Sequence, residues 1–154
     1  MLNIEKYKIL IRWILVFLIM AVIFSFSSQT GEESKAQSVS VASKLLELFG
    51  IVGEDLRTVV RTLRKLAHFG LFALLGASVC HAFSGYNINK AKVIIYSMII
   101  CLVYAISDEV HQGFVPGRGP QIKDVLIDFS GSFTGSGLVM ILYKIKNSGR
   151  NKQK

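Results

Sequence analysis

Ionisable side chains inside apolar sequence are the first candidates for chemistry in this chain. His68 and Asp128 interrupt long apolar segments, whereas Asp108, His111 and Asp124 lie at the ends of such segments. Carboxylates and imidazoles hold divalent metals that activate water, and they also relay protons inside membranes. We therefore take His68, His111, Asp124 and Asp128 as the candidate catalytic residues. No compact ligand motif such as H-E-x-x-H accompanies them, so a divalent metal is an option and no cofactor is predicted.

Cations approach the same region along the sequence that precedes His68. In a continuous helix, Arg57, Arg61, Arg64, Lys65 and His68 fall within an arc of about 100°. This stripe is either a solvated face whose long side chains extend toward water, or one wall of an anion site. The first explanation suits Arg57 and Arg61. It does not suit His68, which lies furthest into apolar sequence.

The segment that contains both prolines of the chain concentrates the remaining polar groups, among them Glu109, Gln112 and Arg118. Its prolines and glycines predict a tight turn. A guanidinium group binds phosphate or carboxylate through two parallel hydrogen bonds. Arg64, Lys65 and Arg118 are therefore the predicted contacts for an anion.

Three kinds of chemistry and one structural role fit these residues. A metal-dependent hydrolase or transferase would activate water against a lipid ester or phosphate. An anion site would use the cations, with Asp108, Asp124 and Asp128 orienting them. A small transporter would relay protons or ions through the acids and His68, and would require an oligomer. The structural alternative is an ion-pair network that fixes helix packing, or a partner-docking subunit.

Apolar blocks show which elements must position these side chains. The 154 residues are 51% hydrophobic and 18% charged, whereas a soluble domain has about 25% charged residues. The blocks lie at residues 13–31, 66–89, 93–107 and 129–143. A hydrocarbon core of about 30 Å needs roughly 20 helical residues, a length that each block reaches alone or with its polar ends. We expect one all-α membrane domain with four transmembrane helices, a core at about 9–143 and a basic tail at 144–154.

Composition excludes other classes of protein. The hydrophobic content excludes an intrinsically disordered chain, and two cysteines exclude a disulfide-rich scaffold. Cys80 and Cys101 lie in apolar blocks and are expected to be buried free thiols. The first block follows three cations, as in a signal peptide, but its long and bulky core favours an uncleaved anchor.

The net charge of +8 reports membrane orientation. Ten Lys and Arg lie in the N-terminus, the loop at 84–92 and the tail, together with one acid. The other two connections hold eight cations and eight acids. The positive-inside rule therefore places both termini in the cytoplasm. The basic tail then faces the anionic inner leaflet, and no nucleic-acid partner is needed to explain it.

The connection between the first two spans predicts a short amphipathic helix. Thr30 and Glu33 have the spacing of a capping box, and Gly50 and Gly53 supply a stop. Apolar residues at i, i+4, i+7 and i+8 form one face between them, namely Val41, Leu45, Leu48 and Phe49. Such a helix lies on the outer leaflet or packs over the bundle, and the sequence favours neither.

Polar stripes on the third and fourth spans predict that acids face the bundle. If the third helix continues to Gln112, one face carries Ser97, Cys101, Tyr104, Asp108 and His111. If the fourth helix starts near Gln121, one face carries Asp124, Asp128, Gly131 and Gly135. The Gly-x-x-x-Gly spacing lets another helix approach closely, so Asp128 is expected inside the bundle. Ser27 and its neighbours supply neutral hydrogen bonds or end the first helix, and the second role is favoured.

Four short motifs together resemble the VanZ family. They are Phe26-Ser27-Ser28-Gln29, Lys65-x-x-His68-Phe69, Asp108-Glu109-x-His111-Gln112-x-Phe114-x-Pro116-x-Arg118 and Asp124-x-x-x-Asp128-x-x-Gly131-x-x-x-Gly135. The resemblance covers about residues 9–143, and the last two motifs make it specific. Phe129-Ser130 departs from the pattern, which has a more polar pair beside the aspartate.

This resemblance implies a small multi-pass protein of the bacterial cell membrane. The name-giving member is associated with reduced susceptibility to the glycopeptide teicoplanin, so the implied link is to that resistance or to cell-envelope homeostasis. No enzyme class is implied. The motif positions carried over are Lys65, His68, Asp108, Glu109, His111, Gln112, Arg118, Asp124 and Asp128.

The residues and the resemblance lead to one functional expectation. An outer-leaflet pocket is expected to bind an anionic envelope lipid or lipid-linked wall precursor, and a homo-oligomer is compatible with this role. The metal-dependent hydrolase or transferase and the partner-docking subunit stay open as alternatives. The expected ligand-binding residues are Arg64, Lys65, His68, Asp108, Glu109, His111, Gln112, Arg118, Asp124 and Asp128.

Overall fold

The chain forms five helices, and a computed structural model describes residues 2–50 and 55–151. The helices are α1 (Leu2–Ser27), α2 (Gly31–Phe49), α3 (Leu56–Phe83), α4 (Lys90–Gln112) and α5 (Ile122–Asn151). No strand occurs in these two ranges. The all-α prediction is therefore confirmed, and α4 ends at Gln112 and α5 begins beside Gln121 as expected.

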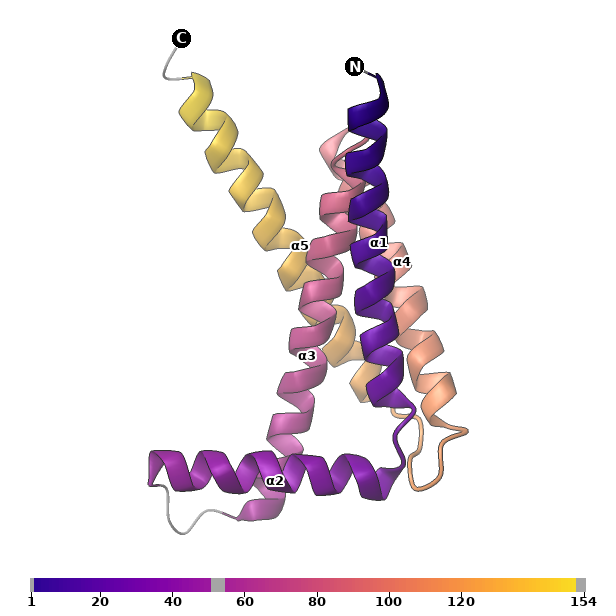
Figure 1. Ribbon diagram of the computed structural model, residues 1–154, viewed down its shortest axis with the longest axis vertical. Coiled ribbons are helices and arrows are strands. Elements are labelled where there is room, and N and C mark those ends of the chain that lie inside the picture. The colour runs from indigo at the N-terminus through magenta and orange to yellow at the C-terminus, as the bar shows by residue number, and fades with distance from the viewer. Residues whose placement is uncertain (1, 51–54, 152–154) are drawn as a thin grey trace.

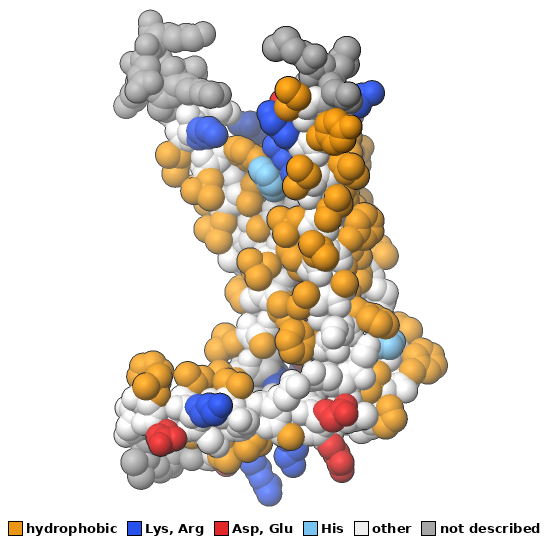
Figure 2. All heavy atoms as spheres, in the orientation of Figure 1, with side chains coloured by type: hydrophobic (Ala, Val, Ile, Leu, Met, Phe, Trp, Pro, Cys, Tyr) orange, Lys and Arg blue, Asp and Glu red, His pale blue; other side chains and the backbone are white. Residues whose placement is uncertain are grey.

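Four of the five helices are long and apolar enough to cross a membrane: α1, α3, α4 and α5. They stand side by side as a bundle (Figure 1). Figure 2 shows hydrophobic side chains along the length of the bundle and charged side chains gathered at its two ends. This distribution matches an apolar hydrocarbon layer between two aqueous boundaries.

Helix α3 is the central element of the bundle. Its residues Phe72, Leu75 and Val79 are fully buried. They pack in one core with Val16 and Ile23 of α1 and with Cys101 and Ala105 of α4. Cys80 and Cys101 are buried free thiols, as predicted.

The closest helix contact joins α3 to α5. A Cβ atom on Gly131 would overlap the carbonyl oxygen of Phe69, and one on Gly135 would overlap that of Ala73. The predicted Gly-x-x-x-Gly approach is thus confirmed, and α3 is its partner. Ser132 and Ser136 of α5 also donate hydrogen bonds to α3 carbonyl oxygens, at 3.2 and 2.9 Å.

Helix α2 lies across one end of the bundle (Figure 1). Its predicted capping box is present, because Thr30 and Glu33 exchange side-chain and backbone hydrogen bonds. These bonds hold the pKa of Glu33 below its ordinary value, so the box is intact at neutral pH. Gly50 ends the helix with a φ of 63°, in the left-handed region. Gly53 lies outside the described residues.

The structure shows that part of α2 packs on the bundle, and the placement of α2 on the outer leaflet stays a prediction. Ala42 is buried against the bundle, whereas the helix end that carries Leu48 and Phe49 projects beyond it. Figure 2 shows hydrophobic side chains on the upper edge of this projecting part, the edge on the same side as the bundle. This is the arrangement of a helix at a membrane boundary.

The first turns of α1 and the last turns of α5 both lie at the end opposite α2, where α5 leans away from α1 (Figure 1). Helix α5 does not stop at Tyr143, where the basic tail was expected to begin, but continues to Asn151. Lysine has a high helix propensity, which explains why the basic residues after Tyr143 continue helix α5 instead of ending it.

Candidate functional site

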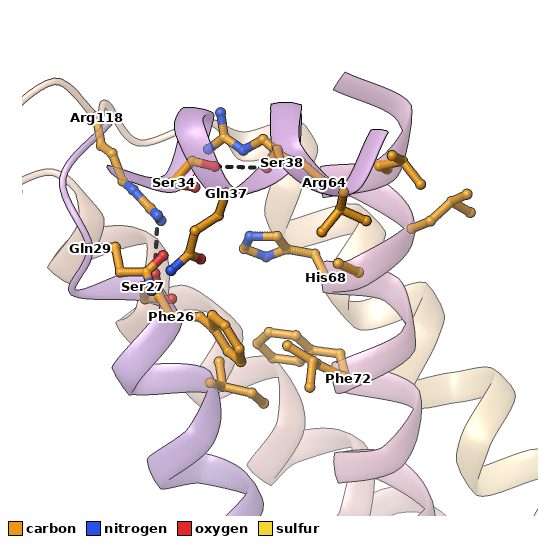
Figure 3. Close-up of a pocket in the computed structure, with 16 residues that line it drawn as sticks. Phe26, Ser27, Gln29, Ser34, Gln37, Ser38, Arg64, His68, Phe72 and Arg118 are labelled. Atoms are coloured by element: carbon orange, nitrogen blue, oxygen red, sulfur yellow. Dashed lines mark hydrogen bonds between the residues drawn. The ribbon is translucent and has the colours of Figure 1, made fainter. Parts of the chain in front are cut away.

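A cavity of about 470 Å³ opens between α1, α2 and α3 at the α2 end of the bundle. Its inner wall is apolar and includes Phe26 and Phe72. Figure 3 shows these two rings below the cavity, with Gln37 reaching down from α2 and the His68 imidazole directed in from α3. Arg64 and Arg118 lie at its polar end. The cavity is therefore amphipathic, with its charged end beside α2.

Two guanidinium groups without carboxylate partners mark this polar end. Arg118 donates from Nη2 to the carbonyl oxygen of Phe26 at 3.0 Å, while its buried Nε has no hydrogen-bond partner. Burial, and then the nearby charge of Arg64, lower the pKa of Arg118 from its ordinary value. Within the described residues neither arginine lies within 4.0 Å of a carboxylate. Two half-buried like charges near one another favour an anion between them.

Asp108 is buried on α4 and held by two donors behind the cavity wall. Ser27 of α1 donates to its Oδ2 at 2.9 Å, and so does Nε2 of Gln112. Its other oxygen, Oδ1, is buried without a partner. Ser27 also lines the cavity, so one hydroxyl connects the cavity wall to this carboxylate.

Asp128 of α5 faces His68 of α3 across the tightest helix crossing. Its Oδ1 lies 3.4 Å from Nδ1 of His68, and its side chain is fully buried. Neither carboxylate oxygen has a hydrogen-bond partner. The glycine contact between Gly131 and Phe69, one turn away on α5, brings the two residues this close.

Glu109 is also buried, but it stabilises the start of α5. Its Oε2 accepts a hydrogen bond of 2.7 Å from the backbone N–H of Gln121, directly before that helix. A carboxylate at a helix N-terminus satisfies a free N–H group and matches the helix dipole. We assign Glu109 a positioning role for α5 and hence for Asp128.

Three predicted site residues do not join these groups. Lys65 is exposed and does not line the cavity, because one residue of helix turns it about 100° away from Arg64. His111 instead contacts Ser28 at 3.1 Å and stacks on Phe24, on the outer side of α1. Asp124, one turn before Asp128, is half-buried and lies outside the carboxylate–imidazole group.

Within the described part of the chain, the acids do not orient Arg64, Lys65 or Arg118 as expected, although Asp128 lies beside His68, which belongs to the same predicted stripe. The acids contact Ser27, Gln112, His68 and a backbone amide, and none pairs with an arginine or Lys65 among the described residues. The physical reason is depth. The arginines lie at the α2 boundary, whereas Asp108 and Asp128 lie behind the cavity wall inside the bundle.

Sequence reasoning missed the contribution of α2 and undervalued Ser27. Ser34, Gln37 and Ser38 of α2 line the cavity, although they belong to its polar face and interrupt no apolar block. Ser27 was interpreted chiefly as a helix end, yet it donates to a buried carboxylate. A serine at the end of a span indicates a buried hydrogen bond only when the neighbouring helix is known.

Chemically, the arrangement offers two adjacent features. The cavity joins an apolar wall to two guanidinium groups, a combination that suits an amphipathic anion. Behind it, His68, Asp108 and Asp128 bring three ligand atoms within 4.8 Å of one another.

Comparison with known proteins provides one match. No curated protein and no solved structure matches the chain significantly. The sequence model of one protein family, described as VanZ/LLP1, matches residues 12–143, which include α2, α3 and α4 completely and the larger part of α1 and of α5. The matched region contains the cavity and the buried acids. The chain therefore belongs to the VanZ/LLP1 family.

Proposed function

We propose that this protein binds an anionic membrane lipid, with the charged headgroup between Arg64 and Arg118 and the acyl or prenyl chain against the apolar wall. The observation that carries the proposal is the pair of guanidinium groups at the polar end of a cavity whose inner wall is apolar. A lipid phosphate matches the bidentate geometry of arginine, and it repays the cost of holding two cations close together.

The apolar wall supports a lipid rather than a soluble anion. Ile23, Phe26, Leu71 and Phe72 line the cavity, and Figure 3 shows Phe26 and Phe72 on the side away from α2. A soluble sugar phosphate has no apolar group for this surface, whereas a lipid tail buries against it. Ser34, Gln37 and Ser38 supply hydroxyl and amide groups at headgroup depth, suited to the glycerol or sugar hydroxyls of an envelope lipid or wall precursor.

The proposal places the α2 end of the bundle at the outer leaflet. The charge distribution supports this orientation, because the cation-rich segments with few acids lie at the end where α1 begins and α5 finishes. Bound envelope lipid in that leaflet would alter how lipid-linked precursors are presented at the cell surface. The resemblance of the chain to the teicoplanin-associated VanZ type supports a role in glycopeptide susceptibility through this presentation.

Lipid retention during native mass spectrometry tests the proposal. Full-length protein is purified in mild detergent with phosphatidylglycerol, polyprenyl phosphate or zwitterionic phosphatidylcholine. We expect the wild type to retain the two anionic lipids. R64A and R118A should each retain them at least about tenfold less, because each substitution removes hydrogen bonds to a charged group that contribute roughly 1.5–3 kcal/mol. K65A is the matched control, because Lys65 neighbours Arg64 but lies outside the cavity.

Two outcomes would contradict lipid-anion binding. The first is equal retention of anionic and zwitterionic lipids by the wild-type protein. The second is the same loss in K65A as in R64A, which would indicate attraction by net positive charge alone. Retention of phosphatidylglycerol without polyprenyl phosphate would narrow the ligand to phospholipid.

A further inference from the structure

One imidazole and two carboxylates converge from three helices behind the wall of the cavity. They belong to His68 of α3, Asp108 of α4 and Asp128 of α5, and one ligand atom from each lies within 4.8 Å of the others. The exposed fractions of Asp108 and Asp128 are 3% and 0%. Three ligands from three different helices define a centre only when the bundle is folded, as structural and catalytic metal centres do.

The carboxylates of this cluster are only weakly compensated, by Nδ1 of His68 at 3.4 Å from Oδ1 of Asp128. Both carboxylate oxygens of Asp128 and Oδ1 of Asp108 are buried without a hydrogen bond. A buried carboxylate without compensation is strongly unfavourable, so natural proteins pair such groups or use them to coordinate metals. The arginines do not serve as partners, since none lies within ion-pair distance of these acids among the described residues.

The surrounding hydrogen bonds are those of a metal ligand shell. Ser27 and Gln112 both donate to Oδ2 of Asp108, which fixes the carboxylate and leaves Oδ1 for another partner. Carboxylates that ligate metals are typically held in this way by outer donors. The Gly131 and Ser132 contacts with α3 position the backbone of α5 beside Asp128, without touching its carboxylate.

We propose that His68, Asp108 and Asp128 form a divalent-cation site in the wall of the cavity. One nitrogen and two carboxylate donors suit Mn²⁺ or Zn²⁺ better than a soft thiolate-binding metal. Three protein ligands leave coordination positions open. His68 lines the cavity, and Ser27, which also lines it, donates to Asp108, so the cluster adjoins the cavity.

A cation-free explanation makes a different prediction for Asp128→Asn. If protonated His68 neutralises Asp128 as a structural ion pair, removing the carboxylate charge removes a favourable interaction and destabilises the protein. If the site belongs to a cation, the neutral amide relieves repulsion between two carboxylates in metal-free protein. D128N then unfolds at the same temperature as the wild type or higher, and gains nothing from added metal.

Manganese binding to the purified full-length protein tests the site. Protein in non-ionic detergent is stripped with EDTA and dialysed, and free Mn²⁺ is counted by electron paramagnetic resonance during titration. We expect one saturable Mn²⁺ per chain, displaced by Zn²⁺, and a rise of several degrees in the unfolding temperature. D128N and D108N should bind at least about tenfold more weakly. D124N is the matched control, since Asp124 lies one turn away from Asp128 and outside the cluster.

Several results would overturn the proposal. The first is that the wild type shows no saturable binding of Mn²⁺ or Zn²⁺. The second is that D124N and D128N weaken Mn²⁺ binding equally. The third is that D128N unfolds at a lower temperature than the wild type, while metal does not change the unfolding temperature of the wild type. If D128N and D108N fail to fold, S27A replaces them. It keeps all three ligands and should weaken Mn²⁺ binding by about tenfold, whereas unchanged affinity would count against the site. None of these measurements uses lipid, so a negative result for the cation site can be distinguished from a negative result for lipid binding.

Discussion

Asp108 shows how a buried charge is controlled at the scale of one residue. Two neutral donors, from α1 and from its own helix, satisfy Oδ2, while Oδ1 stays free. Hydrogen bonds to a charged group contribute more than those between neutral groups, about 1.5–3 kcal/mol. Bonds between helices in membrane proteins are weaker on average, at about 0.6 kcal/mol. The Ser27 bond crosses helices and reaches a buried charge, so both values bear on it.

Removing the Ser27 hydroxyl should therefore destabilise the protein measurably. We expect Ser27→Ala to lower the free energy of unfolding by about 1–2 kcal/mol, between the membrane average and the charged-group value. Unfolding by SDS titration of purified protein measures the change. Ser107→Ala is the control, because the Ser107 hydroxyl is exposed and bonds to the carbonyl oxygen of Tyr104 within its own helix. An equal loss in both variants would show that the Asp108 contact is not special.

Sequence alone identified the acids but not their partners. Asp108 and Asp128 are conspicuous because a charge inside apolar sequence is expensive, and no three-dimensional information is needed to see this. Ser27 and Asp108 are 81 residues apart, so their bond depends on which helices become neighbours. For the same reason, the sequence predicted one network that joins the buried Asp108 and Asp128 to Arg64 and Arg118. Spacing along a helix does not show how deep residues of different helices lie relative to one another.

At the scale of elements, the crossing of α3 and α5 positions the site. Gly131 and Gly135 meet the α3 backbone, and Gly76 of α3 meets the carbonyl oxygen of Ser132 in return. The sequence predicted a close approach at Gly131 and Gly135, but it did not identify α3 as the partner. A glycine pair specifies a flat surface and not the helix that fills it.

Adding one methyl group at this crossing should separate the helices. In Gly131→Ala the new Cβ overlaps backbone, which cannot move as a flexible side chain can, so we expect a cost of about 1–3 kcal/mol, typical of overpacking. The variant should also weaken Mn²⁺ binding, because His68 and Asp128 move apart. SDS unfolding and Mn²⁺ titration measure the two effects.

Gly137 provides a control on the same helix. A Cβ at this position meets nothing within 4 Å. Gly137→Ala should therefore leave Mn²⁺ binding unchanged and stabilise α5 by up to about 1 kcal/mol through helix propensity. Similar losses in both variants would mean that glycine matters for the helix itself and not for the crossing.

At the scale of the whole molecule, the two ends of the bundle differ in charge and in shape. One end carries α2 and the cavity, and the other carries the first turns of α1 and the basic turns of α5. The four spans were predictable because hydrocarbon thickness sets a length that apolar blocks must match. The oblique course of α5 was not, because tilt depends on packing against neighbours.

Orientation can be checked with single cysteines. In a background with Cys80 and Cys101 replaced by alanine, Lys35→Cys lies on α2 and Asn147→Cys near the end of α5, both exposed. We expect a membrane-impermeant maleimide to label position 35 in intact cells, and position 147 only after the membrane is opened. The reverse pattern would place the cavity at the inner leaflet and remove the proposed contact with surface precursors.

Lipid and cation should influence one another if both proposals hold. A cation with open positions beside the cavity favours a phosphate oxygen, and linkage requires each ligand to raise the affinity for the other by the same factor. EDTA should therefore lower phosphatidylglycerol retention by the wild type and by K65A several-fold. Retention by D128N should be low and insensitive to EDTA. Native mass spectrometry with and without EDTA decides this, and a wild type unaffected by EDTA would show that the two ligands bind separately.

The contact between the two connections at the α2 end has a consequence for biogenesis. The N–H of Gly31, the first residue of α2, donates to the carbonyl oxygen of Pro116 at 2.9 Å, and Gly31 packs on Gly117. Gly31 is synthesised long before Pro116, and the α4–α5 connection must reach the same membrane face before this contact can form. Helix α2 therefore reaches its final position only after the last pair of spans inserts. The cavity beneath it is complete only in a fully inserted chain, so an arrested or truncated chain exposes no finished binding site.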